Sequence, residues 1–137
     1  NPIIIKNKLE IDKENVSEKI LQRLILEDIP SFLKELGEGY SFVKNEYKIK
    51  INNTYNYIDL LLFNYIYNSF VVVELKVTEV RKEHIGQIEV YMNYIDKHIK
   101  NITNNKTIGI IVARRDNHYY IEYSSDKRIY TRDYEIV

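Results

Sequence analysis

The stretch F-V-V-V-E-L-K-V, residues 70–77, decides the fold, because two charged residues interrupt a run that is otherwise apolar. Side chains alternate along a strand, so Glu74 and Lys76 share one face while Leu75 points to the other. An earlier run, Y-N-Y-I-D-L-L-L-F at residues 55–63, is also too apolar for a strand exposed to solvent. We therefore predict that the two runs are central strands, joined by a turn around residues 67–69.

Asp59 is the acidic residue of the earlier strand. A hairpin turn near Ile66 or Tyr67 would place Asp59 opposite position 74 or 75 in antiparallel register, so that two carboxylates converge. Such a pair is costly in a sheet unless a cation lies between the two groups. Mg2+ binds one or two carboxylates together with carbonyls, waters and phosphate oxygens, and an adjacent ammonium can orient water or offset phosphate charge. Alternatively, Asp59, Glu74 and Lys76 form a structural ion pair or lie near strand ends and reach solvent, and spacing alone does not decide between these interpretations and a metal site.

A helical region precedes these strands. Apolar residues recur at helical spacing between positions 16 and 36, and Gly37 and Gly39 supply a stop. Pro30 either kinks one long helix near Asp28 or lies in the first turn of a second, short helix. Residues 47–51 then alternate between charged and apolar types, which predicts a half-exposed strand that ends in a turn at residues 52–53.

A further helix is predicted over about residues 78–100, because apolar residues form one stripe: Ile85, Ile88, Met92, Ile95 and Ile99. Gln87 and Tyr91 lie one turn apart on a flank of this stripe that could face the carboxylates, although such pairs are often ordinary surface residues. Residues 101–106 form a loop. A buried strand at 107–113 and a strand at 118–123 are predicted to pair as a hairpin.

The predicted order is helix, three strands, helix, two strands, which indicates an α/β fold with a mixed central sheet. We expect residues 1–137 to form a single domain whose core spans about residues 16–124. The first residue is Asn rather than Met, which indicates a piece of a longer chain or a processed one.

Composition excludes several classes of protein. The 137 residues contain no cysteine and three histidines that are far apart in sequence, which argues against disulfide scaffolds and zinc sites. We find neither a membrane-spanning run nor a signal peptide, so we expect a soluble cytoplasmic protein. Twenty basic and twenty acidic residues cancel, so any surface for nucleic acid must be a local patch.

The sequence resembles a known family of nucleases. An Asp, fourteen residues, then E-x-K, and Q-x-x-x-Y on the next helix are similar to the PD-(D/E)XK nuclease superfamily, particularly its RecB-like members. Successive blocks between Phe32 and Tyr123 resemble the bacterial YhcG-like nuclease domain, including F-L-K-E-L-G, Y-I-D-L-L-L-F, V-V-V-E-L-K-V and H-I-G-Q-I-E-V-Y. The resemblance implies a restriction-endonuclease-like fold and an endonuclease that hydrolyses DNA.

The resemblance also implies roles for individual residues. Asp59 and Glu74 would bind Mg2+, or Mn2+ in its place, with the Leu75 carbonyl as a further ligand. Lys76 would be the catalytic lysine. Gln87 would brace the metal site or a phosphate, and Tyr91 would support it.

Members of the superfamily often add an acid from the first helix. Glu35 matches the F-L-x-E-L-G block of the family, and Glu27 is the alternative at a comparable helical distance.

Some positions depart from the family pattern. Lys44, Asn45 and Glu46 stand where Gly-Arg-Gln is common, so the expected basic contact is altered and partly acidic. Lys82 stands where proline is usual, and Arg81 and Lys82 are either phosphate contacts or solvated charges. The family's helical N-terminal domain is missing from this sequence and would be a partner.

Two other interpretations compete with a Mg2+-dependent deoxyribonuclease. One is a non-catalytic or weakly catalytic nucleic-acid-binding module within a restriction or repair assembly. The other is a homodimerisation domain that packs the stripe Ile88, Met92 and Ile95 on a twin.

Overall fold

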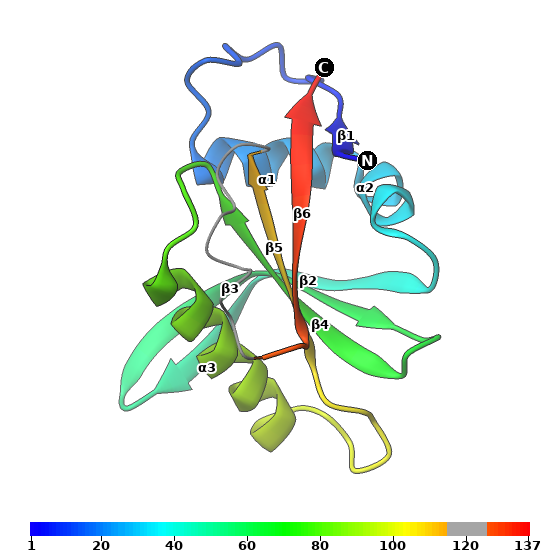
Figure 1. Ribbon diagram of the computed structural model, residues 1–137, viewed down its shortest axis with the longest axis vertical. Helices are drawn as coiled ribbons and strands as arrows, with labels where there is room; N and C mark the ends of the chain where they lie inside the picture. The colour runs from blue at the N-terminus through cyan, green and yellow to red at the C-terminus, as the bar shows by residue number, and fades with distance from the viewer. Residues whose placement is uncertain (115–125) are drawn as a thin grey trace.

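The computed structural model describes residues 1–114 and 126–137, which build one mixed sheet with helices on both faces (Figure 1). The strand order is β1-β6-β5-β4-β3-β2. The strands are β1 (Ile3–Ile5), β2 (Tyr40–Ile51), β3 (Thr54–Asn64), β4 (Ser69–Lys76), β5 (Ile108–Arg114) and β6 (Ile129–Ile136), and the helices are α1 (Glu18–Glu27), α2 (Ile29–Leu36) and α3 (Lys82–His98). The predicted α/β class and mixed sheet are confirmed.

Two kinds of pairing make up the sheet. Strands β2, β3 and β4 are antiparallel neighbours, whereas β4, β5, β6 and β1 pair in parallel. Strands β1 and β6 were not predicted, because β1 has only three residues and β6, I-Y-T-R-D-Y-E-I, mixes polar and apolar residues. The strand predicted at 118–123 lies outside the described residues.

Two helices, α1 and α2, cover one face of the sheet. Ser17 caps α1, because its Oγ accepts a hydrogen bond from the Ile20 N–H at 3.1 Å. Asp28 ends α1 and caps α2 by accepting from the Ser31 N–H at 3.2 Å, with Pro30 in the first turn of α2. The second alternative for Pro30 is therefore correct: it starts a new helix. The core of this face joins α1 and α2 to β4 through Leu21, Leu24, Ile25, Phe32, Val71, Val73 and Leu75.

Helix α3 covers the other face and is shorter than the predicted 78–100. Ile88, Met92 and Ile95 are fully buried against the sheet, so the stripe is not available for a twin and the dimer interpretation built on it is wrong. The helix lies close to β5, where a Cβ on Gly109 would come within 2.6 Å of Met92 Sδ. No helix within residues 1–114 and 126–137 is long and apolar enough to cross a membrane.

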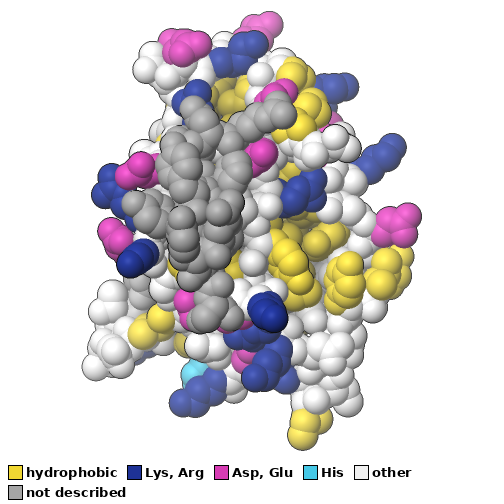
Figure 2. Space-filling model, in the orientation of Figure 1, with side chains coloured by type: hydrophobic (Ala, Val, Ile, Leu, Met, Phe, Trp, Pro, Cys, Tyr) yellow, Lys and Arg dark blue, Asp and Glu magenta, His cyan; other side chains and the backbone are white. Residues whose placement is uncertain are grey.

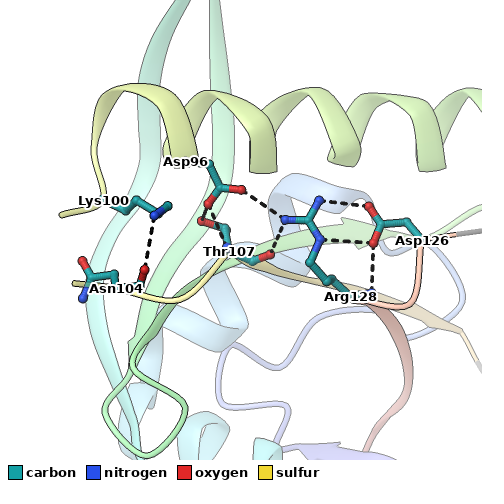
Figure 3. A network of polar contacts seen from close by, with 6 residues as sticks. All are labelled: Asp96, Lys100, Asn104, Thr107, Asp126 and Arg128. Atoms are coloured by element: carbon teal, nitrogen blue, oxygen red, sulfur yellow. Dashed lines mark hydrogen bonds and ion pairs between the residues drawn. The ribbon is translucent and has the colours of Figure 1, made fainter. Parts of the chain in front are cut away.

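A polar network ties the end of α3 to the sheet (Figure 3). Asp96 Oδ1 accepts from the Thr107 N–H at 2.8 Å and from Thr107 Oγ1 at 2.7 Å. Arg128 Nη1 donates to Asp96 Oδ2 at 3.1 Å and to the Thr107 carbonyl at 3.3 Å, while Nη2 donates to Asp126 Oδ2 at 3.1 Å. The network fixes α3, the start of β5 and the segment before β6 relative to one another.

Candidate functional site

The site lies where β3 and β4 separate. Their backbone pairing runs from Asn64↔Ser69 to Leu60↔Val73, so the next position places Asp59 opposite Glu74. Side chains continue the ladder there: the Asp59 N–H donates to Glu74 Oε2 at 2.9 Å, and the Leu75 N–H donates to Asp59 Oδ2 at 2.8 Å. The structure thus brings together the two carboxylates that sequence reasoning paired.

Both carboxyl groups are poorly solvated. Burial raises the pKa of Glu74, which is 4 % exposed, and the negative charge of Asp59 raises it further. Burial also raises the pKa of Asp59, although the hydrogen bond from the Leu75 N–H and the charge of Lys76 oppose this shift. Two converging acids with raised pKa values are a frequent signature of a functional site.

Lys76 brings an ammonium group beside the acids. The residue is 8 % exposed, and its positive charge lowers the pKa values of both Asp59 and Glu74. Its Nζ lies 3.9 Å from Oε1 of Glu18, the first residue of α1. The structure therefore brings Asp59, Glu74 and Lys76 together at the point where the pairing of β3 with β4 stops.

Helix α1 contributes two side chains that the sequence analysis missed. Glu18 lies near the triad, and its negative charge raises the pKa values of Asp59 and Glu74. Gln22, one turn later and 5 % exposed, donates from Nε2 to the Asp59 carbonyl at 3.0 Å. Their i, i+4 spacing was the available signal, but it is equally typical of a solvated helix surface.

The structure places Glu35 and Glu27 elsewhere. Glu35 Oε1 accepts from the Ile4 N–H of β1 at 2.7 Å, and β5 and β6 lie between β1 and β4 in the sheet. The expectation that Glu35 joins the acids is therefore corrected, because Asp28 divides the helical region and Glu35 belongs to α2. Glu27 is exposed and lies nine residues beyond Glu18 on α1, about 13 Å along the helix.

Helix α3 approaches the acids from the other face. Burial raises the pKa of Tyr91 to about 12, with further contributions from the charges of Glu74 and Asp59, and a side-chain hydrogen bond with Gln87 opposes the shift. Tyr91 is 4 % exposed, whereas Gln87 is exposed to solvent. His84, which sequence reasoning did not select, lies close enough for the charge of Lys76 to add to the burial that lowers its pKa.

The sequence profile of the YhcG PDDEXK nuclease domain matches residues 3–136. The chain belongs to the YhcG PDDEXK nuclease domain family. It is 27 % identical over 101 residues to "Putative nuclease YhcG" of Escherichia coli (strain K12), an alignment that covers 74 % of this chain and 27 % of that protein.

Solved structures share the fold of this YhcG-family domain. A repair endonuclease from Pyrococcus abyssi superposes with a TM-score of 0.63 at 18 % identity, covering 91 % of this chain and 50 % of that one. EndoMS, in a structure described as an EndoMS-dsDNA2 complex, superposes with a TM-score of 0.62 at 19 % identity, and the match covers 91 % of this chain and 48 % of that one. The fold is restriction-endonuclease-like, and the YhcG-family chain spans about a quarter of its curated relative and half of these structures.

The basic residues expected to contact nucleic acid in this YhcG-family domain lie on β2 and at the start of α3. Lys44 is exposed on β2 beside a bulge, and Lys82 is exposed at the first turn of α3. Arg81 is exposed at the N-cap of α3, with its Nε 3.4 Å from Glu79 Oε1. Basic and acidic side chains are interspersed on the face drawn in Figure 2, in keeping with the zero net charge.

The donor set of this YhcG-family site fits an open Mg2+ site. Asp59 and Glu74 offer carboxylates, and the Leu75 carbonyl points toward β3, because the N–H and C=O of one strand residue point the same way and the Leu75 N–H bonds Asp59. Over the described residues, no group of three His, Cys, Asp or Glu side chains is placed to enclose a metal ion. Carbonyl, water and substrate oxygens would complete the coordination, as Mg2+ commonly requires.

Proposed function

We propose that this domain is a Mg2+-dependent endonuclease that hydrolyses phosphodiester bonds of DNA. The observation that carries the proposal is a pair of hydrogen bonds across the two strands, from the Asp59 N–H to Glu74 and from the Leu75 N–H to Asp59, which holds two poorly solvated carboxylates together beside Lys76. Membership of a nuclease family supports hydrolysis, and the dsDNA complex of the structural neighbour EndoMS supports DNA as the substrate class.

Each side chain has a distinct role in the proposed reaction. A bound Mg2+ would supply Lewis-acid activation of a water and neutralisation of phosphate charge. Asp59, Glu74 and the Leu75 carbonyl hold the ion. Lys76 donates hydrogen bonds to the attacking water or to the scissile phosphate, because its ammonium lies beside both acids.

Other residues support this constellation. Gln22 fixes the Asp59 backbone from α1. Tyr91, braced by Gln87, closes the α3 side of the site and excludes water from the carboxylates. The exposed Lys44, Arg81 and Lys82 contact phosphates beyond the scissile one.

Plasmid nicking tests the activity. Wild-type protein, Lys76→Ala and Asp59→Asn are compared in Mg2+, in Mn2+ and in EDTA, with Lys106→Ala as a matched control because Lys106 is exposed in the loop before β5. We expect the wild type and the Lys106 variant to nick plasmid in Mg2+ and in Mn2+ but not in EDTA. The nicking rate of both site variants should be at least 100-fold lower than that of the wild type. Equal cleavage by all four proteins would reject catalysis at this site.

A silent wild-type domain that still bound DNA would favour the binding-module interpretation. Adding the helical domain of a longer relative in trans separates a missing partner from an inactive site. Activity restored by the partner, and lost again in Lys76→Ala, would assign catalysis to this domain.

A further inference from the structure

No helix within residues 1–114 and 126–137 buries the outward face of the β2–β3 hairpin around residues 48–57. Two cross-strand pairs, Lys48↔Tyr57 and Lys50↔Tyr55, lie on this face. Tyr55 and Tyr57 are 54 % and 50 % exposed, and both lysines are exposed as well. On the opposite face of the same ribbon, Ile49 and Ile58 are buried in the core with α3. The ribbon is therefore anchored on one side and open on the other.

Positive charge accompanies the two exposed rings. Lys48 Nζ lies 4.1 Å from the centroid of the Tyr55 ring, and Lys50 Nζ lies 5.6 Å from it. Residues 44–58 contain three lysines and one glutamate, a net charge of +2, in a chain whose net charge is zero. The single acid, Glu46, is paired with Lys19 at 2.6 Å. This ribbon is a local basic patch in a protein whose net charge is zero.

The two tyrosines of the patch lie on the same strand as Asp59. Tyr57 and Tyr55 precede Asp59 by two and four residues on β3, about 7 and 13 Å along the strand. Residues 54–58 extend past the pairing of β3 with β4, which ends at Leu60↔Val73. A strand of nucleic acid leaving the site along β3 would therefore meet these four side chains in succession.

We propose that this face, formed by Lys48, Lys50, Tyr55 and Tyr57, binds a single-stranded segment of the DNA substrate. The lysines contact phosphates, and the tyrosine rings stack on unpaired bases, as aromatic side chains do in single-strand binding grooves. Bases paired in a blunt duplex are already stacked, so the rings discriminate in favour of unpaired ends or gaps. This assignment rests on the nuclease function proposed above and names its substrate class.

A second exposed aromatic group provides the matched control. Tyr65 and Tyr67, 71 % and 57 % exposed, lie in the turn between β3 and β4, at the opposite end of β3 from Tyr55 and Tyr57. Replacing either with alanine removes an equally exposed ring without altering the β2–β3 face.

Fluorescence anisotropy tests the assignment, with Ca2+ in place of Mg2+ to prevent cleavage and with a single-stranded oligonucleotide and its blunt duplex as probes. We expect Tyr55→Ala and Tyr57→Ala each to weaken single-strand binding by about 5- to 100-fold, while duplex binding stays within about twofold. Lys48→Gln and Lys50→Gln should each lower the slope of log K against log salt by about 0.7 for the single strand. Tyr65→Ala and Tyr67→Ala should match the wild type.

Two outcomes would overturn the assignment: tyrosine variants that bind single strands like the controls, or variants that weaken duplex and single-strand binding equally. The lysine slopes provide a measurement that does not depend on the stability of the tyrosine variants. Plasmid nicking is scored separately. If the wild type nicks plasmid and the tyrosine variants bind single strands as the wild type does, only the binding surface is rejected. If the tyrosine variants lose single-strand binding but the wild type never nicks plasmid, only the nuclease function is rejected.

Discussion

Asp59 and Glu74 are bound to each other's strands: the Asp59 N–H donates to Glu74, and Asp59 accepts from the Leu75 N–H. Each acid thus replaces a backbone contact at the point where β3 and β4 separate. The same side chains that would bind a metal ion also hold the hairpin in register. Changes at this point affect stability and activity together.

The first prediction concerns pH and metal ions. In the folded state the pKa is raised to about 6 for Asp59 and to about 8 for Glu74. An unfolded carboxyl group has a pKa near 4, so above about pH 4 the folded protein binds more protons than the unfolded chain. Metal-free stability should therefore fall as pH rises from about 4 to about 8. Because Mg2+ offsets the negative charge of the two buried carboxylates, it should raise Tm more at pH 8 than at pH 5, as measured by calorimetry.

Neutral isosteres provide the control for this prediction. Asp59→Asn and Glu74→Gln should each flatten the pH dependence and reduce the response of Tm to Mg2+. A wild type whose Tm rises steadily between pH 5 and pH 8 in EDTA would contradict the assigned direction.

A second prediction separates the helix glutamates. Glu18→Gln should raise the Mg2+ concentration needed for half-maximal nicking by about 10-fold, the range found when groups around a metal site are changed, because its charge acts on both site acids. Glu35→Gln and Glu27→Gln should leave this concentration unchanged. If Glu35→Gln has the larger effect, the placement of α2 relative to the site is wrong.

A third prediction tests Gln22 as a positioning residue. Gln22→Leu leaves the Asp59 carbonyl without its side-chain donor in a buried setting, so unfolding free energy should fall by about 1–3 kcal/mol. Mg2+ affinity, measured by titration calorimetry, should fall as well. Arg23→Ala, an exposed neighbour on α1, is the control. If Gln22→Leu lowers stability but leaves Mg2+ affinity unaltered, Gln22 contributes to stability and does not position Asp59 for the metal ion.

A fourth prediction concerns the network in Figure 3. Arg128→Leu removes the cation that is paired with Asp96 and Asp126 and should lower the unfolding free energy by about 2–4 kcal/mol, as measured by urea denaturation. The network lies at the start of β5, whereas the acids lie at the end of β4, so Mg2+ affinity in the folded fraction should be retained. A specific loss of Mg2+ affinity would reveal coupling between the two ends of the sheet.

Local patterns predicted the central part of the fold. The alternation in residues 70–77 and the apolar character of 55–63 identified the β3–β4 hairpin, and the helical stripe identified α3, because burial on both sides leaves strong periodic signals. The prediction that Asp59 lies opposite position 74 or 75 followed from strand register alone. Strands β1 and β6 were not predicted, because β1 has only three residues and β6 mixes polar with apolar residues.

Tertiary placement explains the errors at the site. Glu35 and Glu18 are both helix glutamates, but the break at Asp28 puts them on different helices, and only α1 lies beside Lys76 and Asp59. Gln22 and His84 carry no distinctive spacing, so only coordinates reveal their neighbours. The roles of Lys44, Arg81 and Lys82 stay predictions, because they depend on a substrate.

The bulge near Val43 and the left-handed backbone of Glu46, with φ of 47°, interrupt β2, which lies at an edge of the sheet. A long, regular edge strand presents unpaired N–H and C=O groups that can pair with strands of neighbouring molecules and promote aggregation. The bulge and the left-handed residue divide the free edge of β2 into shorter regular segments. The domain can therefore expose a twelve-residue outer strand and still resist fibril-like association.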